Sequence, residues 1–117
     1  MNDFTAKQAI TRETIESLIM SAIEGGSNYW YRIESDTNGD YLKQAFTDQG
    51  LTISNFMVQD EDEAKSGVLN PASMQRALDL MPGKYNHILA DIISGNEDAI
   101  SGDVFLQLAV FGECIYG

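Results

Sequence analysis

Cysteine, histidine and proline are scarce in this chain, which has one, one and two of them among its 117 residues. Because Cys114 has no second cysteine to pair with, an internal disulfide is excluded and we expect a reducing cytoplasmic compartment. His87 and Cys114 are too few for a zinc site of histidine and cysteine ligands within one chain. They also lack the local signature of a nucleophilic pair. We therefore predict a protein that is not an enzyme and uses no cofactor or metal.

Basic residues are also few: seven lysines and arginines stand against eighteen acidic residues, for a formal charge of −11. This balance disfavours binding to nucleic acid or to an anionic membrane, because the long-range field repels phosphate. It is compatible with docking on a basic protein surface, although net charge by itself mainly sets solubility.

Long apolar runs are missing too, and none reaches the ~20 residues that span a bilayer. The first residues show no basic region followed by an apolar one, so no secretion signal is expected. With 44% hydrophobic residues, the sequence predicts a single domain over residues 1–117 with its own core. Within it, we expect residues 1–10 to be a mobile N-terminal segment and residues 59–68, which include "DEDE", to be an exposed acidic loop.

The clearest helical periodicity runs from Thr11 to Glu24. Apolar residues recur there at the spacing of one helical face, namely Ile15, Leu18, Ile19, Ala22 and Ile23. Thr11 is the expected N-cap, and Gly25 is expected to end the helix in the left-handed conformation.

Two strands are predicted, around residues 28–34 and 51–58, with a bulge at Ser54–Asn55 where the alternation changes phase. A turn at "SDTNGD" and a short helix between Asp40 and Gly50 separate them. Three helices follow the second strand. The first is capped by Asn70, with Pro71 in its first turn, and the second stops at Gly95.

The last helix, predicted from about Asp103 to Ile115, is apolar on nearly every side. Its second apolar face includes Leu106 and Val110, which we expect to be covered because burying each such side chain stabilises by roughly 1.5–3 kcal/mol. Either this helix lies in the middle of the domain, or Leu106 and Val110 form a homo-oligomer interface. The predicted fold class is therefore α+β, with four to five helices packed on a short two-stranded antiparallel sheet and a largely buried C-terminal helix.

Metal and phosphate motifs are incomplete. "DTNGDY" resembles the start of a calcium loop through Asp36, Asn38 and Asp40. The match then fails, because Tyr41 stands where the loop needs glycine and Thr47 where it needs glutamate. "EGGSN" lacks the lysine and the glycine spacing of phosphate-binding loops. A turn is the better interpretation of the first motif, and a helix end of the second.

The aromatic strand is the best candidate binding surface. On a strand, Tyr29 and Tyr31 point to one side and Trp30 and Arg32 to the other. If the tyrosines enter the core, Trp30 and Arg32 face outward together, a pairing enriched in binding hot spots and able to stack a flat ligand such as a nucleobase. Alternatively, Trp30 packs under a helix and Arg32 pairs with nearby acidic residues.

Three stretches carry a resemblance to known proteins: "SAIEGGSNYWYRIE", "RALDLMPGKYNHILADII" and "GDVFLQLAVFGECIYG". They are similar to small acidic proteins of tailed bacteriophages and prophages, and the similarity spans most of the chain. It implies a host-cell setting, but it brings no mechanism with it.

In that setting, we expect an interaction protein that inhibits or modulates a host defence or nucleic-acid enzyme by binding a host protein. One alternative is an oligomeric binder of a nucleotide-like small molecule at Tyr29, Trp30, Tyr31 and Arg32. A second alternative is a DNA mimic, which needs carboxylates spaced like phosphates over a long face.

Overall fold

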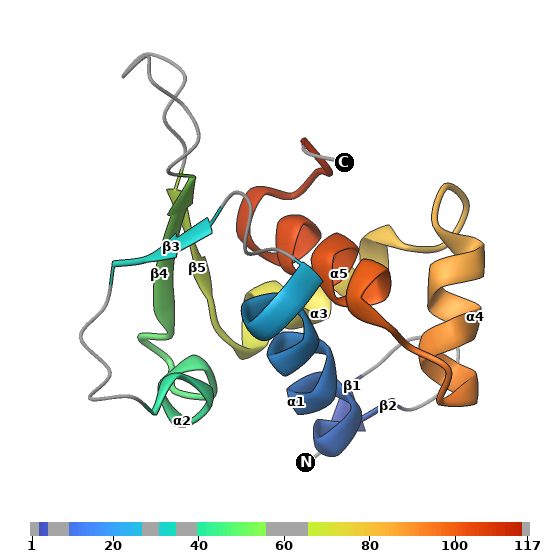
Figure 1. Ribbon diagram of the computed structural model, residues 1–117, viewed down its shortest axis with the longest axis horizontal. Helices are drawn as coiled ribbons and strands as arrows, with labels where there is room; N and C mark the ends of the chain where they lie inside the picture. Colours follow the sequence, from blue (N-terminus) through green and yellow to red (C-terminus); the bar gives the residue numbers. More distant parts are fainter. Residues whose placement is uncertain (1–2, 5–9, 27–30, 35–39, 56–65, 116–117) are drawn as a thin grey trace.

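The fold is α+β and mainly helical, as the sequence predicts. The computed structural model describes residues 3–4, 10–26, 31–34, 40–55 and 66–115 (Figure 1). Its helices are α1 (Arg12–Ser21), which continues into a π-helical turn, η1 (Ala22–Gly26), then α2 (Tyr41–Ala45), α3 (Pro71–Leu80), α4 (Asn86–Ser94) and α5 (Ala99–Phe111). Its strands are β1 (Asp3–Phe4), β2 (Ile10–Thr11), β3 (Tyr31–Ile33), β4 (Leu51–Asn55) and β5 (Ser66–Leu69).

The sheet has three antiparallel strands in the order β3-β4-β5, one more than predicted. The prediction of an exposed loop at 59–68 is wrong for residues 66–68, which belong to β5. Residues 59–65 lie outside the described residues. Serine and glycine rarely favour strands, so Ser66–Gly67 gave no local signal. The packing supplies the reason instead: Gly67 lies so close to α5 that an added Cβ would be 2.0 Å from the carbonyl oxygen of Val110.

Strands β3 and β4 pair without interruption. Tyr31 lies opposite Asn55 and Arg32 opposite Ser54, with Ile33 opposite Ile53. The predicted bulge at Ser54–Asn55 is therefore wrong. The apolar residues that suggested the change of phase begin at position 56, which is outside the described residues.

Helix α1 begins as predicted but ends differently. The Thr11 hydroxyl accepts a hydrogen bond from the Thr14 N–H at 3.3 Å, which caps the helix. The predicted stripe faces the core, with Ile15, Leu18 and Ile19 fully buried. Gly25 is not left-handed, so this part of the prediction is wrong, although the helical segment does end at the glycine pair, at Gly26. The chain instead widens into η1.

The N-terminal segment is partly paired. Strands β1 and β2 form a separate antiparallel ribbon, with Asp3 opposite Thr11 and Phe4 opposite Ile10. Ile10 is only 3% exposed and belongs to the core. The part of residues 1–10 that the structure describes is thus paired next to the start of α1, and the mobility of the segment stays a prediction.

The shorter helices follow their local signals closely. Asp40 caps α2 by accepting from the Lys43 N–H at 3.2 Å. Asn70 and Ser73 form a capping box at the start of α3, with Pro71 in the first turn. Helix α4 ends at Gly95, whose φ of 82° is left-handed. Each of these ends is determined by residues within one turn of it.

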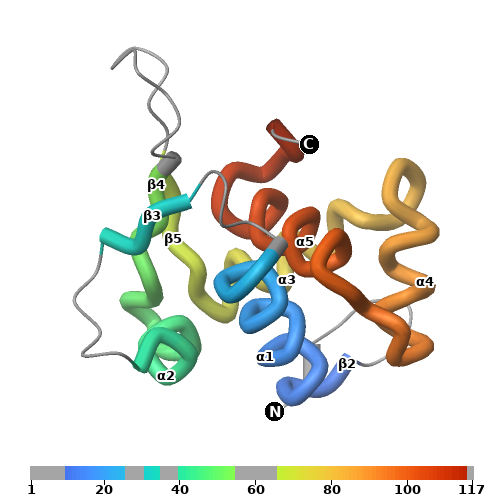
Figure 2. The backbone as a smooth tube through the Cα atoms, in the orientation of Figure 1, coloured from blue at the N-terminus to red at the C-terminus, as the bar shows by residue number. Residues whose placement is uncertain are grey.

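Helix α5 lies in the middle of the domain, between α1, α3, α4 and the sheet (Figures 1 and 2). Leu106 is 0% exposed and Val110 is 5% exposed in the single chain. This confirms the prediction of a largely buried C-terminal helix. The alternative, an oligomer interface through Leu106 and Val110, is wrong, because the chain itself already covers both side chains.

The boundaries of α5 differ from the predicted Asp103–Ile115. Asp98 caps the helix by accepting from the Ser101 N–H at 2.9 Å, and Gly112 ends it with a φ of 78°. Gly102 therefore lies inside the first turns of the helix. Glycine is tolerated there because α1 crosses at this point: an added Cβ would lie 2.7 Å from the Leu18 carbonyl oxygen.

Gln107 is the one polar residue in the apolar stretch of α5, and it is 1% exposed. Its side-chain oxygen accepts from the Ile115 N–H at 2.8 Å, and its nitrogen donates to Asp103 at 3.1 Å. Buried polar groups are costly without such partners. Gln107 thus holds the segment after Gly112 against the helix.

Candidate functional site

The aromatic strand is only partly described by the structure. Tyr29 and Trp30 lie outside the described residues, so their predicted role in binding stays a prediction. Tyr31 is half-buried against the core, and its hydroxyl donates to the Ile23 carbonyl at 2.6 Å. The Arg32 side chain is 65% exposed. Tyr31 therefore points inward and Arg32 outward, as strand alternation predicts.

Arg32 is engaged by its own chain. Its Nε lies 2.8 Å from Glu34 Oε1, and the same oxygen accepts from the Ser54 hydroxyl at 2.6 Å. The hydrogen bond from Ser54, and then the one from Arg32, lowers the pKa of Glu34. Both hydrogen bonds favour the ionised form of the Glu34 carboxyl group, which pairs with the Arg32 guanidinium. This matches the alternative in which Arg32 pairs with a nearby acidic residue.

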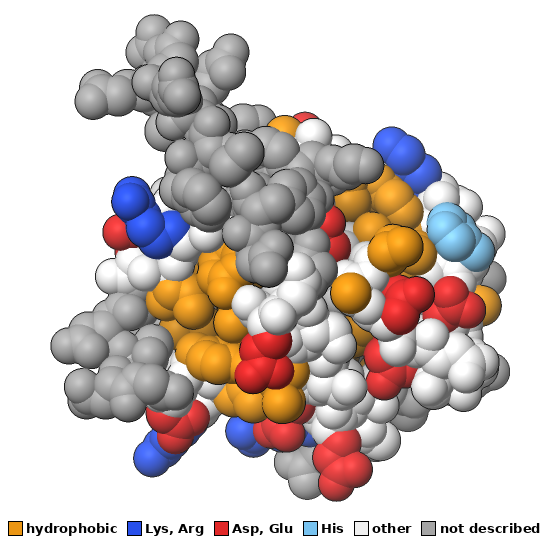
Figure 3. Space-filling view, in the orientation of Figure 1, with side chains coloured by type: hydrophobic (Ala, Val, Ile, Leu, Met, Phe, Trp, Pro, Cys, Tyr) orange, Lys and Arg blue, Asp and Glu red, His pale blue; other side chains and the backbone are white. Residues whose placement is uncertain are grey.

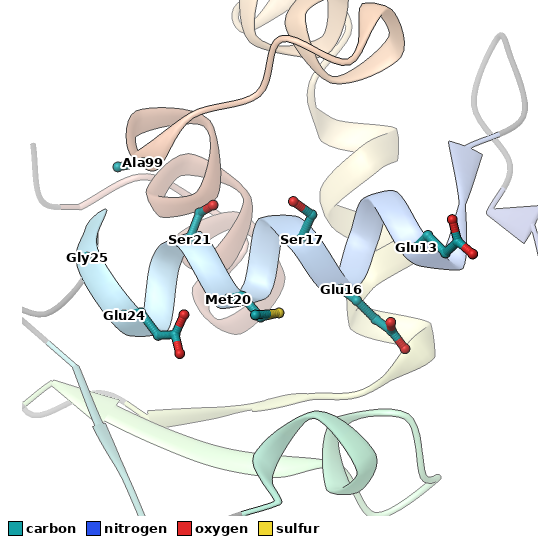
Figure 4. Close-up of a pocket in the computed structure, with 8 residues that line it drawn as sticks. All are labelled: Glu13, Glu16, Ser17, Met20, Ser21, Glu24, Gly25 and Ala99. Atoms are coloured by element: carbon teal, nitrogen blue, oxygen red, sulfur yellow. The ribbon is translucent and has the colours of Figure 1, made fainter.

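The structure reveals a different candidate surface, an open groove along the outer side of α1 with a volume of about 500 Å³. We call it the α1 groove. Eight residues line it: Glu13, Glu16, Ser17, Met20, Ser21, Glu24, Gly25 and Ala99. Glu16, Met20 and Glu24 project on the side of α1 and η1 that faces the sheet and α2, whereas Ser17 and Ser21 project on the opposite side (Figure 4).

The helical period explains why these side chains share a surface. The buried stripe of α1 turns Ile15, Leu18 and Ile19 inward, so the residues between them face out. Met20 lies in this outward set and is 40% exposed. In the orientation of Figure 1, hydrophobic side chains gather between the sheet and α1, and acidic side chains lie beside them (Figure 3).

The α1 groove is acidic. Three of its lining residues are glutamates, and none of the lining residues that the structure describes is a lysine or arginine. Arg12 lies near the groove, where its Nε is 3.1 Å from Glu16 and its guanidinium is 4.1 Å from the centre of the Phe46 ring. Arg12 therefore offsets part of the charge at the Glu16 end, through an exposed pair that contributes little stability.

The charge of Glu24, which lines the groove, affects the pKa of two tyrosines. Burial, and then the charge of Glu24, raises the pKa of Tyr31. The same two causes, in the same order, raise the pKa of Tyr41 on α2, and Tyr31 adds to the effect. The charge of Glu24 thus contributes to the pKa of one residue in β3 and one in α2.

Chemically reactive side chains are dispersed. His87 is exposed on α4, while Cys114 is half-buried beyond the end of α5. Burial raises the pKa of the Cys114 thiol, which disfavours the nucleophilic thiolate. Over the described residues, no three histidine, cysteine or acidic side chains come together as a metal site. No helix within the described ranges combines the length and apolarity needed to cross a bilayer.

Known proteins offer no further guide to this surface. Comparison of the chain with protein-family models, with curated proteins and with solved structures finds no match. The site is therefore argued from its own residues alone.

The α1 groove was not predicted from the sequence, although one signal for it is present. Met20 is a large apolar residue that falls outside the buried stripe of α1, among glutamates and serines. An apolar side chain on the polar face of a helix is a mark of a contact surface, because exposed apolar area is otherwise avoided. The extent of the groove depends on Ala99, which only the tertiary structure brings next to α1.

Proposed function

We propose that this protein acts by binding, and that the α1 groove takes a basic segment of a partner protein. The observation that carries the proposal is the groove lining, which combines exposed Met20 with Glu13, Glu16 and Glu24. Carboxylates around an apolar centre favour a cationic segment with one apolar side chain. The lining residues of α1 and η1 run from Glu13 to Gly25, a length suited to about three helical turns of a partner.

Charge selects the class of occupant. A second copy of this chain also carries a net charge of −11 and would bring acidic residues against acidic residues. A nucleotide or nucleic acid would bring phosphates into the same negative field. A basic protein segment is the occupant that the charge favours, and in a phage setting this partner is a host protein in the host-cell cytoplasm.

The two alternative functions have less support. A nucleotide-like ligand was predicted to use Arg32, whose guanidinium is already paired with Glu34. A DNA mimic needs a long face of carboxylates alone, whereas the α1 groove has Met20 near its middle. Both alternatives therefore serve as outcomes of the experiment that tests the proposal.

The test uses two synthetic helical peptides of about fifteen residues, one with leucine and arginine on one face and one with glutamate in place of arginine. We expect the basic peptide to bind the full chain, with affinity falling as salt rises, and the acidic peptide not to bind. The proposal is overturned if neither peptide binds, or if a nucleotide panel raises the melting temperature when the basic peptide does not.

Paired variants locate the binding. Glu13→Gln with Glu16→Gln should weaken the basic peptide roughly tenfold, from about 0.5–1 kcal/mol for each exposed charge contact. The control, Asp48→Asn with Glu113→Gln, removes the same charge from exposed residues outside the groove. If both pairs of variants weaken peptide binding equally, the peptide is attracted by the overall negative charge and not by the groove. A DNA mimic would give this outcome. Met20→Ser should weaken binding of the basic peptide if the peptide lies in the groove, but not if it is held only by the general negative field.

A further inference from the structure

Arg12 contacts the lining of the α1 groove although it is not itself part of that lining. Its Nε lies 3.1 Å from Oε1 of Glu16, one of the three glutamates that line the groove. Glu16 projects from α1 on the side that faces the sheet and α2 (Figure 4). A guanidinium of the same chain therefore already occupies a carboxylate that the proposed partner would use.

The place of the Arg12–Glu16 pair on the helix makes it weak. Arg12 is the first residue of α1, where the helix dipole is positive and a basic residue is unfavourable. Pairs at this i,i+4 spacing are more favourable when the glutamate comes first, and here the arginine does. The side chains are 50% and 35% exposed, so water screens their charges. The pair can thus be exchanged for another at little cost.

A second contact keeps Arg12 in this position. Its guanidinium carbon lies 4.1 Å from the centre of the Phe46 ring, which follows α2 and packs against the core. A cation within about 6 Å of a ring centre is attracted by the face of the ring. Phe46 is not among the residues that line the groove. It therefore holds the guanidinium next to Glu16 without taking a place that the partner would occupy.

We propose that Arg12 competes with the partner for Glu16: it pairs with this carboxylate in the free chain, and a basic side chain of the bound segment displaces it. This inference rests on the proposed function of the α1 groove. Displacement exchanges one ion pair for another, so a single cation gains little by binding. A segment that also contacts Met20, Glu13 and Glu24 gains from those contacts as well. Arg12 thereby selects a segment that fits the length of the groove over isolated cations.

The first test measures the basic peptide against the full chain and two variants that each lose one positive charge. Arg12→Gln should bind the peptide about two- to fivefold more tightly than the natural chain, because the Glu16 carboxylate is then unoccupied. The control is Lys84→Gln. Lys84 is exposed, lies 5.5 Å from the centre of the Tyr85 ring and does not line the groove, so the affinity should stay nearly unchanged. Equal gains in both variants, or no gain in Arg12→Gln, would overturn the competition.

A double variant separates competition from simple repulsion by Arg12. Arg12→Gln is combined with Glu16→Gln, and the affinity of the peptide is compared with that of Glu16→Gln alone. Competition predicts that most of the gain from Arg12→Gln is lost without Glu16, because no carboxylate is released. Repulsion predicts the same gain in both backgrounds, and this result would contradict the proposal. Thermal melts check that each variant keeps the fold.

A direct measurement on the natural chain needs no substitution. In the free chain, the Nε–H signal of Arg12 should be shifted by Glu16 and by the ring of Phe46. On saturation with the basic peptide, it should move toward the signal of a solvent-exposed arginine. If the peptide binds and this signal stays in place, the competition is wrong and the groove stands. If the peptide binds neither the natural chain nor Arg12→Gln, the groove proposal is wrong and the competition falls with it.

Discussion

Gly102 in α5 and Leu18 in α1 approach with their backbones in contact, without a side chain between them. A Cβ on Gly102 would lie 2.7 Å from the Leu18 carbonyl oxygen and 2.9 Å from the Ala22 nitrogen. Atoms this close must shift, and backbone atoms of a packed helix shift only at a cost. This contact sets how closely α1 lies against the central helix, and so where the α1 groove begins.

Gly102→Ala should therefore destabilise the protein. Overpacking in a close crossing costs about 1–3 kcal/mol, which exceeds the gain of up to ~1 kcal/mol from replacing glycine within a helix. The free energy of unfolding in urea measures the difference. Gly25→Ala is the matched control, because its Cβ would meet nothing within 4 Å and its φ is not left-handed, so it should be neutral or slightly stabilising. Equal effects of the two variants would contradict the close crossing.

Tyr31→Phe should loosen the end of η1. It removes the hydroxyl that donates to the Ile23 carbonyl at 2.6 Å, at a cost of about 0.5–1.5 kcal/mol at neutral pH. Burial, and then the charge of Glu24, raises the pKa of Tyr31 above the ordinary tyrosine value. Its contribution is therefore complete below the ordinary tyrosine pKa and is lost as the pH rises through the folded-state value. The measurement is urea unfolding between about pH 8 and about pH 11, which covers the titration range. As the pH rises, the free energy of unfolding should fall less in Tyr31→Phe than in the natural chain.

Tyr85→Phe provides the comparison for that experiment. The Tyr85 pKa is also raised, but mainly by a hydrogen bond with Cys114 and not by Glu24. Removing the Tyr85 hydroxyl should leave the amide hydrogen exchange of residues 22–25 unchanged, whereas Tyr31→Phe should speed exchange there. Unchanged exchange in both variants would show that the Tyr31 hydroxyl does not hold η1.

Asp98→Asn should change the acid sensitivity of the protein more than its stability at neutral pH. The Asp98 carboxylate accepts from the N–H and the hydroxyl of Ser101, and the backbone hydrogen bond is the main cause that lowers its pKa. Its contribution is present above the ordinary aspartate pKa and is lost as the pH falls through the lower folded-state value. Asparagine keeps an acceptor oxygen without this titration.

The measurement is urea unfolding at neutral and acidic pH. Asp98→Asn should cost only a few tenths of a kcal/mol at neutral pH and should lose less stability than the natural chain on acidification, whereas Asp98→Ala should cost about 1 kcal/mol at neutral pH. If Asp98→Asn and the natural chain lose stability in parallel as the pH falls, the carboxylate of Asp98 does not carry the acid-dependent cap.

Local chemistry in the sequence was enough for the helix starts and the buried stripes. Thr11, Asp40 and Asn70 cap the helices that follow them because each side-chain oxygen reaches an amide only three residues away. The spacing of Ile15, Leu18 and Ile19 likewise needs no distant partner to predict a buried face. The apolar excess of the last helix also predicts that both of its faces are covered, but only the structure shows that its own chain covers them.

Contacts between distant segments decided the rest. β5 can lie against α5 because Gly67 has no side chain to clash with Val110, and α1 can cross α5 because Gly102 has none to clash with Leu18; neither contact can be inferred from neighbouring residues in the sequence. The α1 groove is of the same kind: Met20 signals a surface, but Ala99 reaches the groove only through the fold. Sequence alone determines which residues must be buried or capped, since those forces act locally, whereas the partners across a crossing depend on how the whole core closes.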